Sequence, residues 1–272
     1  MEKIFKSAVV GMGGIGKTHA TCIKNNPNAE LVCVCDVNKQ RADEAAEQFG
    51  VPAVYSVKDM LKNYPEIEVV HVTTSGFENG SWHYVPTMEC LDAGKHVLVE
   101  KPISNNIEEA REMVAYATKK DLYLGCDLNH YFSEPAFRAD QLIKDNKVGE
   151  QVYALTKVGF NGSAVNVGVA DPNSRMNMMY AHTKAFLTHP FSVMRHFSGD
   201  ITHIQCFMEK PGARKQSGDL MMSIASVNMK FQNGCIGYML SQRGDACFGL
   251  GGWWSYELAG TRGTFCIENC VE

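Results

Sequence analysis

The sequence has no long apolar segment and no dense block of basic residues. None of its apolar runs approaches the ~18 residues that a membrane-spanning helix needs, which argues against a membrane protein. The formal net charge is −4, and lysine and arginine are not concentrated in any segment, so the charge pattern of a nucleic-acid-binding protein is missing. The first residues pass from charge to a short apolar stretch and then to glycines, unlike a secretory signal. We therefore expect a cytoplasmic protein without a nucleic-acid or membrane partner.

The sequence also lacks a C-x-x-C pair, although it contains ten cysteines. Several of them lie in strand-like apolar runs such as LVCVCD (31–36), so we expect buried thiols in a reducing compartment. Cys266 and Cys270 are close together, but no second pair accompanies them, and a structural zinc ion needs about four such ligands. The sequence therefore predicts no metal site.

The order of the apolar runs predicts two domains in the 272 residues. Up to residue 124, short β-branched runs alternate with helix-like segments, which is typical of an α/β domain with a parallel sheet. From residue 125 onward, longer strand-like runs are joined by turns such as QNG (232–234), which indicates an α+β domain with a mostly antiparallel, open sheet. We expect domains at 1–124 and 125–272.

The motif GMGGIG (11–16) fits G-x-G-x-x-G and lies between a predicted strand and a predicted helix. A second predicted strand follows and ends in Asp36, 20 residues after Gly16. This is the arrangement of a Rossmann dinucleotide site, in which the helix N-terminus meets a pyrophosphate. The predicted cofactor-binding residues of this segment are Gly11, Met12, Gly13, Gly14, Ile15, Gly16 and Asp36.

Asp36 also indicates which dinucleotide is bound. Its carboxylate would accept hydrogen bonds from the adenosine ribose and repel a 2′-phosphate, so the sequence favours NAD over NADP. Lys39 and Arg41 are near enough in the sequence to leave use of both cofactors open.

A second motif, LDAGKHVLVEKP (91–102), resembles the Gfo/Idh/MocA family of sugar and cyclitol oxidoreductases. The resemblance extends over most of the chain, including AVVGMGGIGKTH (8–19), LNHYFSEPAF (128–137) and ELAGTRGTF (257–265). It implies an N-terminal Rossmann domain, a C-terminal domain on an antiparallel sheet, and pairing of subunits through that sheet into a homodimer or homotetramer. It also implies further structure after the last predicted strand, so the chain would be short for the family or truncated.

The resemblance implies hydride transfer between NAD and a secondary hydroxyl of a sugar, cyclitol or glycoside. Lys101 of the EKP motif would be a catalytic residue that binds the reacting hydroxyl and also contacts the cofactor. His130 and Tyr131 would contact the substrate. The remaining residues that it implies for cofactor binding are Thr73, Thr74, His83, Glu100 and Asn129.

The stretch HTKAFLTHP (182–190) supplies the candidate base and departs from the family pattern. It opens a predicted helix at THPFSVMRHFSGD (188–200), in which Thr188 would be the N-cap and His189 takes the place of the family's catalytic histidine. Ala185 stands where the family has an aspartate. We expect His189 to act as general base, with Lys184 as a catalytic neighbour and His182 as a substrate contact; for Lys184 and His182 a solvated loop is equally compatible.

Two other clusters of side chains have competing interpretations. His182, His189 and His196 recur every seven residues, but such positions lie ~10 Å apart on one helix, too far for ligands of a single metal ion. The aromatic group of Trp253, Trp254 and Tyr256 suits sugar stacking, a core or a subunit interface, and we expect the interface.

Three hypotheses for the function remain open at this point. The first is an NAD-dependent dehydrogenase that acts on a ring hydroxyl. The second is a glycoside-cleaving enzyme in which bound NAD is reduced and reoxidised within each cycle. The third is a cofactor-binding protein that has lost catalysis, which Ala185 suggests. Net formation of NADH separates the first hypothesis from the second, and NAD binding without turnover would support the third.

Overall fold

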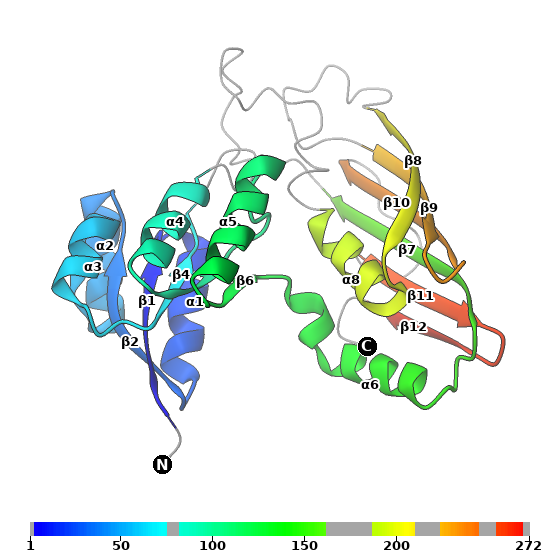
Figure 1. The fold of residues 1–272 in the computed structure, drawn as a ribbon, viewed down its shortest axis with the longest axis horizontal. Coiled ribbons are helices and arrows are strands. Elements are labelled where there is room, and N and C mark those ends of the chain that lie inside the picture. Colours follow the sequence, from blue (N-terminus) through cyan, green and yellow to red (C-terminus); the bar gives the residue numbers. More distant parts are fainter. Residues whose placement is uncertain (1–2, 75–81, 162–186, 210–223, 245–253, 269–272) are drawn as a thin grey trace. The chain divides into compact units, whose positions relative to one another are not determined.

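The computed structural model describes residues 3–74, 82–161, 187–209, 224–244 and 254–268. The chain divides into two compact units, Met1–Asp127 and Leu128–Glu272, and each has its own six-stranded sheet (Figure 1). Strand β6 (Leu124–Cys126) lies across the boundary expected after residue 124. It pairs with β5, so the first sheet extends to Cys126.

The first unit is built on a parallel sheet, as the sequence predicted, and its strand order is β3-β2-β1-β4-β5-β6. This is the strand order of a doubly wound dinucleotide-binding fold, which binds ligands at the carboxyl edge of the strands. The strands before β6 are β1 (Phe5–Val10), β2 (Ala29–Cys35), β3 (Ala53–Val54), β4 (Val69–Val72) and β5 (His96–Val99).

Helices cover both faces of this sheet. One core cluster joins α1 and α2 to the sheet, and a second joins α3, α4 and α5 to the opposite face. Side-chain caps fix several starts: Asn38 before α2, Ser56 before α3 and Asn106 before α5 each accept from a backbone N–H of the first turn. The helices are α1 (Gly14–Asn25), α2 (Lys39–Phe49), α3 (Val57–Asn63), α4 (Tyr84–Asp92) and α5 (Ile107–Lys119).

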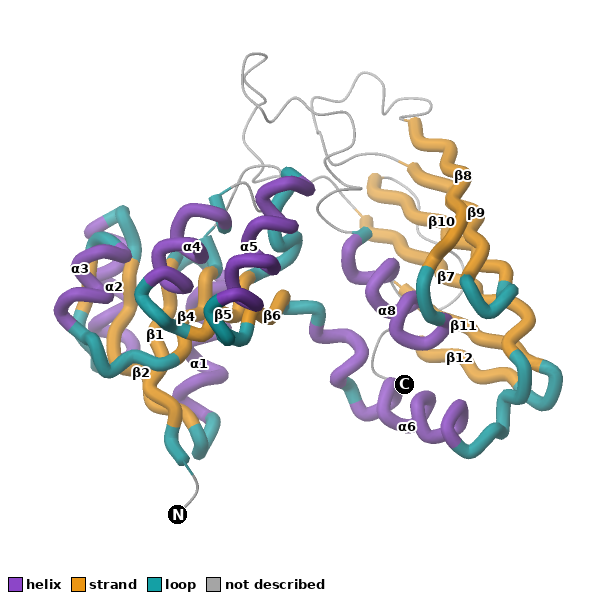
Figure 2. The backbone as a smooth tube through the Cα atoms, in the orientation of Figure 1, coloured by secondary structure: helices purple, strands orange, loops and turns teal. Residues whose placement is uncertain are grey.

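The second unit is built on a mostly antiparallel sheet with the order β12-β11-β7-β10-β9-β8 (Figure 2). All of its neighbouring strands pair antiparallel except β7 and β10, which are parallel. The predicted turn at QNG joins β9 to β10, and Gly234 has a φ of +89° there. The strands are β7 (Gln151–Asn161), β8 (Ile201–Glu209), β9 (Ile224–Phe231), β10 (Ile236–Gly244), β11 (Trp254–Gly260) and β12 (Thr264–Glu268).

The 3₁₀ helix η1 (Asn129–Phe132) and the helices α6 (Glu134–Lys144) and α8 (Thr188–Ser198) complete the second unit. Side chains of α6 and α8 pack on one face of the sheet around a core of alternate strand residues. Tyr256 is fully buried in this core and bonded to Ser198, so its expected place in a subunit interface is wrong. Thr188 is inside α8 and gives no side-chain cap; Leu187 occupies the N-cap position instead.

The cysteines of the described residues are free thiols, in keeping with the absence of paired spacing in the sequence. Cys33 and Cys35 of β2 are buried, and burial raises the pKa of each thiol to about 12. Cys22, Cys206 and Cys266 are exposed, so burial holds only for part of the set. In the described part of the chain, no helix has the length and apolar content that crossing a bilayer requires.

Candidate functional site

The glycine-rich loop connects β1 to α1 at the carboxyl edge of the first sheet. Gly11 has a φ of +98°, and a Cβ there would lie 2.7 Å from the Thr74 backbone nitrogen. A Cβ at Gly16 would lie 1.9 Å from the Gly11 carbonyl oxygen, so only glycine lets α1 start so close to the strand. At Gly13 and Gly14 no heavy atom lies within 4 Å of the Cβ position. The backbone there is open to an anion at the helix N-terminus.

Asp36 follows β2, and its buried carboxylate holds this loop. Its Oδ2 accepts from the backbone N–H of Met12 at 2.8 Å, and its Oδ1 accepts from that of Asn38 at 2.8 Å. Arg41 Nη1 lies 3.5 Å from Oδ2. Asp36 therefore shapes the glycine loop in addition to facing the pocket, a structural role that the sequence analysis missed.

A pocket at this edge brings together most of the residues predicted to bind the cofactor. Met12 does not line it but is fully buried behind the loop, and Gly16 packs against Gly11. Asn129 belongs to the second unit, where it begins η1. Trp82, Val57 and Arg41 also line the pocket. The predicted residues in its lining are Gly11, Gly13, Gly14, Ile15, Asp36, Thr73, Thr74, His83, Glu100 and Lys101.

Thr73 and His83 connect the loops around the pocket through backbone carbonyl groups. Thr73 Oγ1 donates to the Gly11 carbonyl oxygen at 2.7 Å. His83 Nε2 lies 2.7 Å from the Thr74 carbonyl oxygen, and its Nδ1 lies 3.0 Å from that of Pro102. Burial lowers the pKa of His83, while these two carbonyl groups oppose the shift. His83 thus fixes the backbone at Thr74 and at Pro102, next to the pocket.

Glu100 and Lys101 follow β5, where the sheet ends. Glu100 Oε2 accepts from the backbone N–H of Lys101 at 3.0 Å. The Glu100 backbone N–H donates to the Val72 carbonyl oxygen at 2.9 Å, which continues the pairing with β4. The backbone at Lys101 is therefore fixed by the carboxylate of the residue before it.

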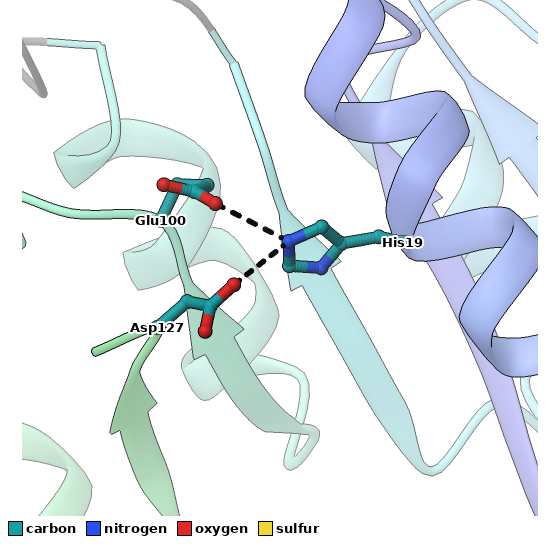
Figure 3. Close-up of side chains that lie close together, drawn as sticks. All are labelled: His19, Glu100 and Asp127. Carbon is teal, nitrogen blue, oxygen red and sulfur yellow. Dashed lines mark hydrogen bonds and ion pairs between the residues drawn. The ribbon is translucent and has the colours of Figure 1, made fainter. Parts of the chain in front are cut away.

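The other carboxylate oxygen of Glu100 takes part in a cluster with His19 and Asp127 (Figure 3). His19 Nε2 lies 3.3 Å from Glu100 Oε1 and 3.1 Å from Asp127 Oδ2, and His19 Nδ1 lies 3.0 Å from His71 Nδ1. These side chains come from α1, β4 and the ends of β5 and β6. This cluster was not predicted from the sequence, although His19 is the last residue of the segment AVVGMGGIGKTH (8–19).

The pKa values in this cluster are shifted in opposite directions. Burial lowers the pKa of His19, but hydrogen bonds and charges of Asp127 and Glu100 outweigh it and raise the pKa to about 9. Burial and the charge of His19 lower the pKa of His71 to about 4. The nearest side-chain nitrogen and oxygen atoms of His19, Glu100 and Asp127 lie within 4.8 Å of one another. With His19 protonated at Nε2 between two carboxylates, the cluster forms an ion-paired histidine.

In the second unit, the predicted base lies beside a predicted substrate contact. His189 is in the first turn of α8, and its ring lies edge-on to that of His130, with centroids 4.5 Å apart. Tyr131 stacks on His196, with centroids 4.9 Å apart and planes at 8°. His196 Nε2 donates to Asp140 of α6 at 3.0 Å. His196 and Asp140, neither of them predicted to contact substrate, thus hold Tyr131 beside the end of α8.

The other predicted residues of this segment lie outside the described residues. They are His182, Lys184 and Ala185. Trp253 also lies outside them.

Residues 5–127 match the family model described as an oxidoreductase family with an NAD-binding Rossmann fold, Gfo/Idh/MocA. This range coincides with the first unit from the start of β1 to its end at Asp127. The first unit belongs to the Gfo/Idh/MocA family. The resemblance expected from the EKP and glycine-loop segments is thereby confirmed.

Individual relatives align with about half of the chain. Trans-1,2-dihydrobenzene-1,2-diol dehydrogenase of Mus musculus is 29% identical over 159 residues, which are 58% of this chain and 46% of that protein. D-glucoside 3-dehydrogenase of Escherichia coli (strain K12) is 31% identical over 150 residues, 55% of this chain and 41% of that protein. The chain therefore spans less than half of the length of these relatives.

The similarity of fold extends over both units. Scyllo-inositol dehydrogenase of Lactobacillus casei, solved with NAD(H) and scyllo-inositol, superposes with a TM-score of 0.81 at 22% identity. The superposition covers 98% of this chain and 77% of that one. The second unit thus shares the fold of that structure, an α+β arrangement on a mostly antiparallel sheet, as the sequence predicted.

Proposed function

We propose that the protein is an NAD-dependent oxidoreductase that transfers a hydride between nicotinamide and a secondary hydroxyl of a sugar, cyclitol or glycoside. One observation carries this proposal: a single pocket is lined by the glycine loop, Asp36 and Lys101. Such a pocket offers a site for the pyrophosphate, an acceptor for the ribose and a cation for a substrate oxygen. The family of the first unit and the chemistry named for its relatives support the same reaction.

Each residue of the proposed site has its own role in binding or catalysis. The glycine loop and the N-terminus of α1 bind the pyrophosphate, and Asp36 accepts from the adenosine ribose. Bound NAD supplies the hydride acceptor. Lys101 donates a hydrogen bond to the reacting hydroxyl, and His189 takes its proton as general base. His130, adjacent to His189, and Tyr131 contact the substrate.

The proposed substrate is a ring-shaped secondary alcohol. The relatives are named for a dihydrodiol, a glucoside and, for a myo-inositol 2-dehydrogenase of Thermotoga maritima, a cyclitol. What these compounds share is a hydroxyl on a six-membered ring with a neighbouring hydroxyl. The proposal rests on this shared chemistry and does not name one compound.

We also propose a homo-oligomer that pairs through the second sheet. Helices α6 and α8 pack on one of its faces. The opposite face presents apolar side chains, of which Phe207 is 68%, Ile236 53% and Tyr153 41% exposed. An exposed apolar surface of this kind favours association. As its location we propose the reducing cytoplasm, on the basis of the buried thiols of β2.

The test is NADH formation from NAD, followed by absorbance, across a panel of free sugars, inositols and glycosides. We expect turnover with at least one ring alcohol and none in Lys101→Met, which should still bind NAD. Lys62→Met is the matched control, because Lys62 is exposed at the end of α3. Full activity in Lys101→Met would refute the role of that residue. Glycoside cleavage without net NADH would favour internal recycling of NAD, and NAD binding without any turnover would favour an inactive member.

A further inference from the structure

His19 lies where four elements of the first unit meet, namely α1, β4 and the ends of β5 and β6. It projects from α1 toward the carboxyl edge of the sheet, where Glu100 and Asp127 follow neighbouring strands (Figure 3). His71 of β4 contacts the other ring nitrogen. Among the described residues, these three are the titratable groups that face the His19 ring.

The contacts define where the protons of this cluster are. A carboxylate only accepts, so His19 Nε2 must carry the hydrogen that Glu100 and Asp127 share. The two Nδ1 atoms of His19 and His71 are 3.0 Å apart, so one of them donates and the other accepts. Because His19 faces two carboxylates and His71 faces a positive charge, His19 carries both protons. His71 is neutral and accepts through Nδ1.

Glu100 transmits this arrangement to the predicted catalytic lysine. One of its oxygens accepts from the His19 ring, and the other accepts from the backbone N–H of Lys101. Both oxygens are thereby held, and so is the plane of the carboxylate. Without the imidazolium, Glu100 and Asp127 would be two close carboxylates of like charge, and Glu100 would turn away from its neighbour.

We propose that His19 is a positioning residue, which fixes the backbone at Lys101 through the carboxylate of Glu100. The inference rests on the proposed function for the catalytic importance of Lys101, but the positioning itself does not depend on turnover. Asp127 has a different part. Its Oδ2 lies 3.1 Å from His19 Nε2, so it shares the proton of His19 and stabilises the positive charge of that ring.

The first test measures amide hydrogen exchange in the NAD-bound protein. In His19→Gln and His19→Leu, the Lys101 amide should exchange at least roughly tenfold faster, because its acceptor is no longer held. The Glu100 amide, bonded to Val72, should keep its wild-type rate. His96→Gln is the control, since His96 begins β5 at the opposite edge of the sheet. Wild-type protection of Lys101 in both His19 variants would overturn the proposal.

The second test measures turnover on a substrate found in the panel. We expect kcat to fall roughly 10- to 100-fold in His19→Leu, as for a misplaced catalytic group, with the Kd of NAD within about twofold of wild type. His19→Gln, which keeps a donor without the charge, should fall between the two. The ratio of wild-type kcat to His19→Gln kcat should shrink as the pH rises through about 9, where His19 loses its proton. A ratio that is constant with pH, or wild-type kcat in His19→Leu, would overturn the proposal.

Asp127→Asn keeps the test decisive if the His19 variants do not fold. It retains the contact between His19 and Glu100 but removes one of the two charges that stabilise the proton. We expect near wild-type kcat at neutral pH and a loss of activity that begins at lower pH than in the wild type. An unmoved profile would count against His19. If the wild type itself has no turnover, the proposed function fails, while the exchange rates of Lys101 still decide the positioning role.

Discussion

The ion-paired His19 should make the stability of the first unit depend on pH in a defined window. Its pKa is about 9 in the folded unit, against 6.5 for an ordinary histidine. Because the folded pKa is raised, the stabilisation is complete below pH 6.5 and is lost as the pH rises through about 9. At ~1.4 kcal/mol per pKa unit, the shift corresponds to about 3 kcal/mol. The partly exposed Asp127 is screened by solvent, which reduces the expected contribution to about 2 kcal/mol.

Urea unfolding of wild type and His19→Gln between pH 6.5 and about 8.5 measures this contribution. The free energy of unfolding of the wild type should fall by about 2 kcal/mol more than that of the variant. The raised pKa values of the buried Cys33 and Cys35 thiols also lower the free energy of unfolding at high pH. This effect occurs mainly above the pH window of the experiment and is equal in both proteins. Equal slopes for wild type and His19→Gln would refute the ion-paired state.

Three further predictions concern the two units separately. Asp36→Ala should weaken NAD binding by roughly 10- to 100-fold in a calorimetric titration, since charge-assisted hydrogen bonds are lost, and an unchanged Kd would show that the adenosine end binds elsewhere. Gly16→Ala should destabilise the first unit by about 1–3 kcal/mol, because the new Cβ would meet the Gly11 carbonyl oxygen. Gly13→Ala is the control and should keep the wild-type Tm, because no heavy atom lies within 4 Å of its Cβ position. Identical melting of the two variants would contradict this steric account. His189→Ala should remove the acidic limb of the kcat/KM profile, and a surviving limb would assign the base to another residue.

The first unit was predictable from the sequence because its signals are local. The spacing of the glycines, the strand that ends at Asp36 and the run that leads to Glu100 and Lys101 each lie within about thirty residues, and a βαβ unit keeps such segments adjacent. The structure places these segments around one pocket. Their roles in binding and catalysis stay predictions until they are tested.

The features that were not predicted from the sequence depend on contacts between distant segments and on burial. His19 is one polar residue in a helix, and nothing near it in the sequence indicates that Asp127, over one hundred residues later, will share its proton. Tyrosine is common in subunit interfaces, but the register of β11 places the Tyr256 side chain in the core. Threonine often caps helices, but Thr188 lies inside the first turn of α8, and Leu187 occupies the N-cap position. Burial and register, rather than residue type, decide each case.

In this chain, the cofactor preference and the shape of the glycine loop both depend, by our prediction, on the side chain of Asp36. The carboxylate of Asp36, which is predicted to favour NAD, also accepts from the backbone N–H groups of Met12 and Asn38. A change that removes its charge to admit a 2′-phosphate therefore leaves two backbone donors without their acceptor. Arg41 already lies at the carboxylate and would be released to a phosphate. A switch to NADP thus requires a replacement side chain that still accepts from the loop, so serine or asparagine is a better starting point than alanine.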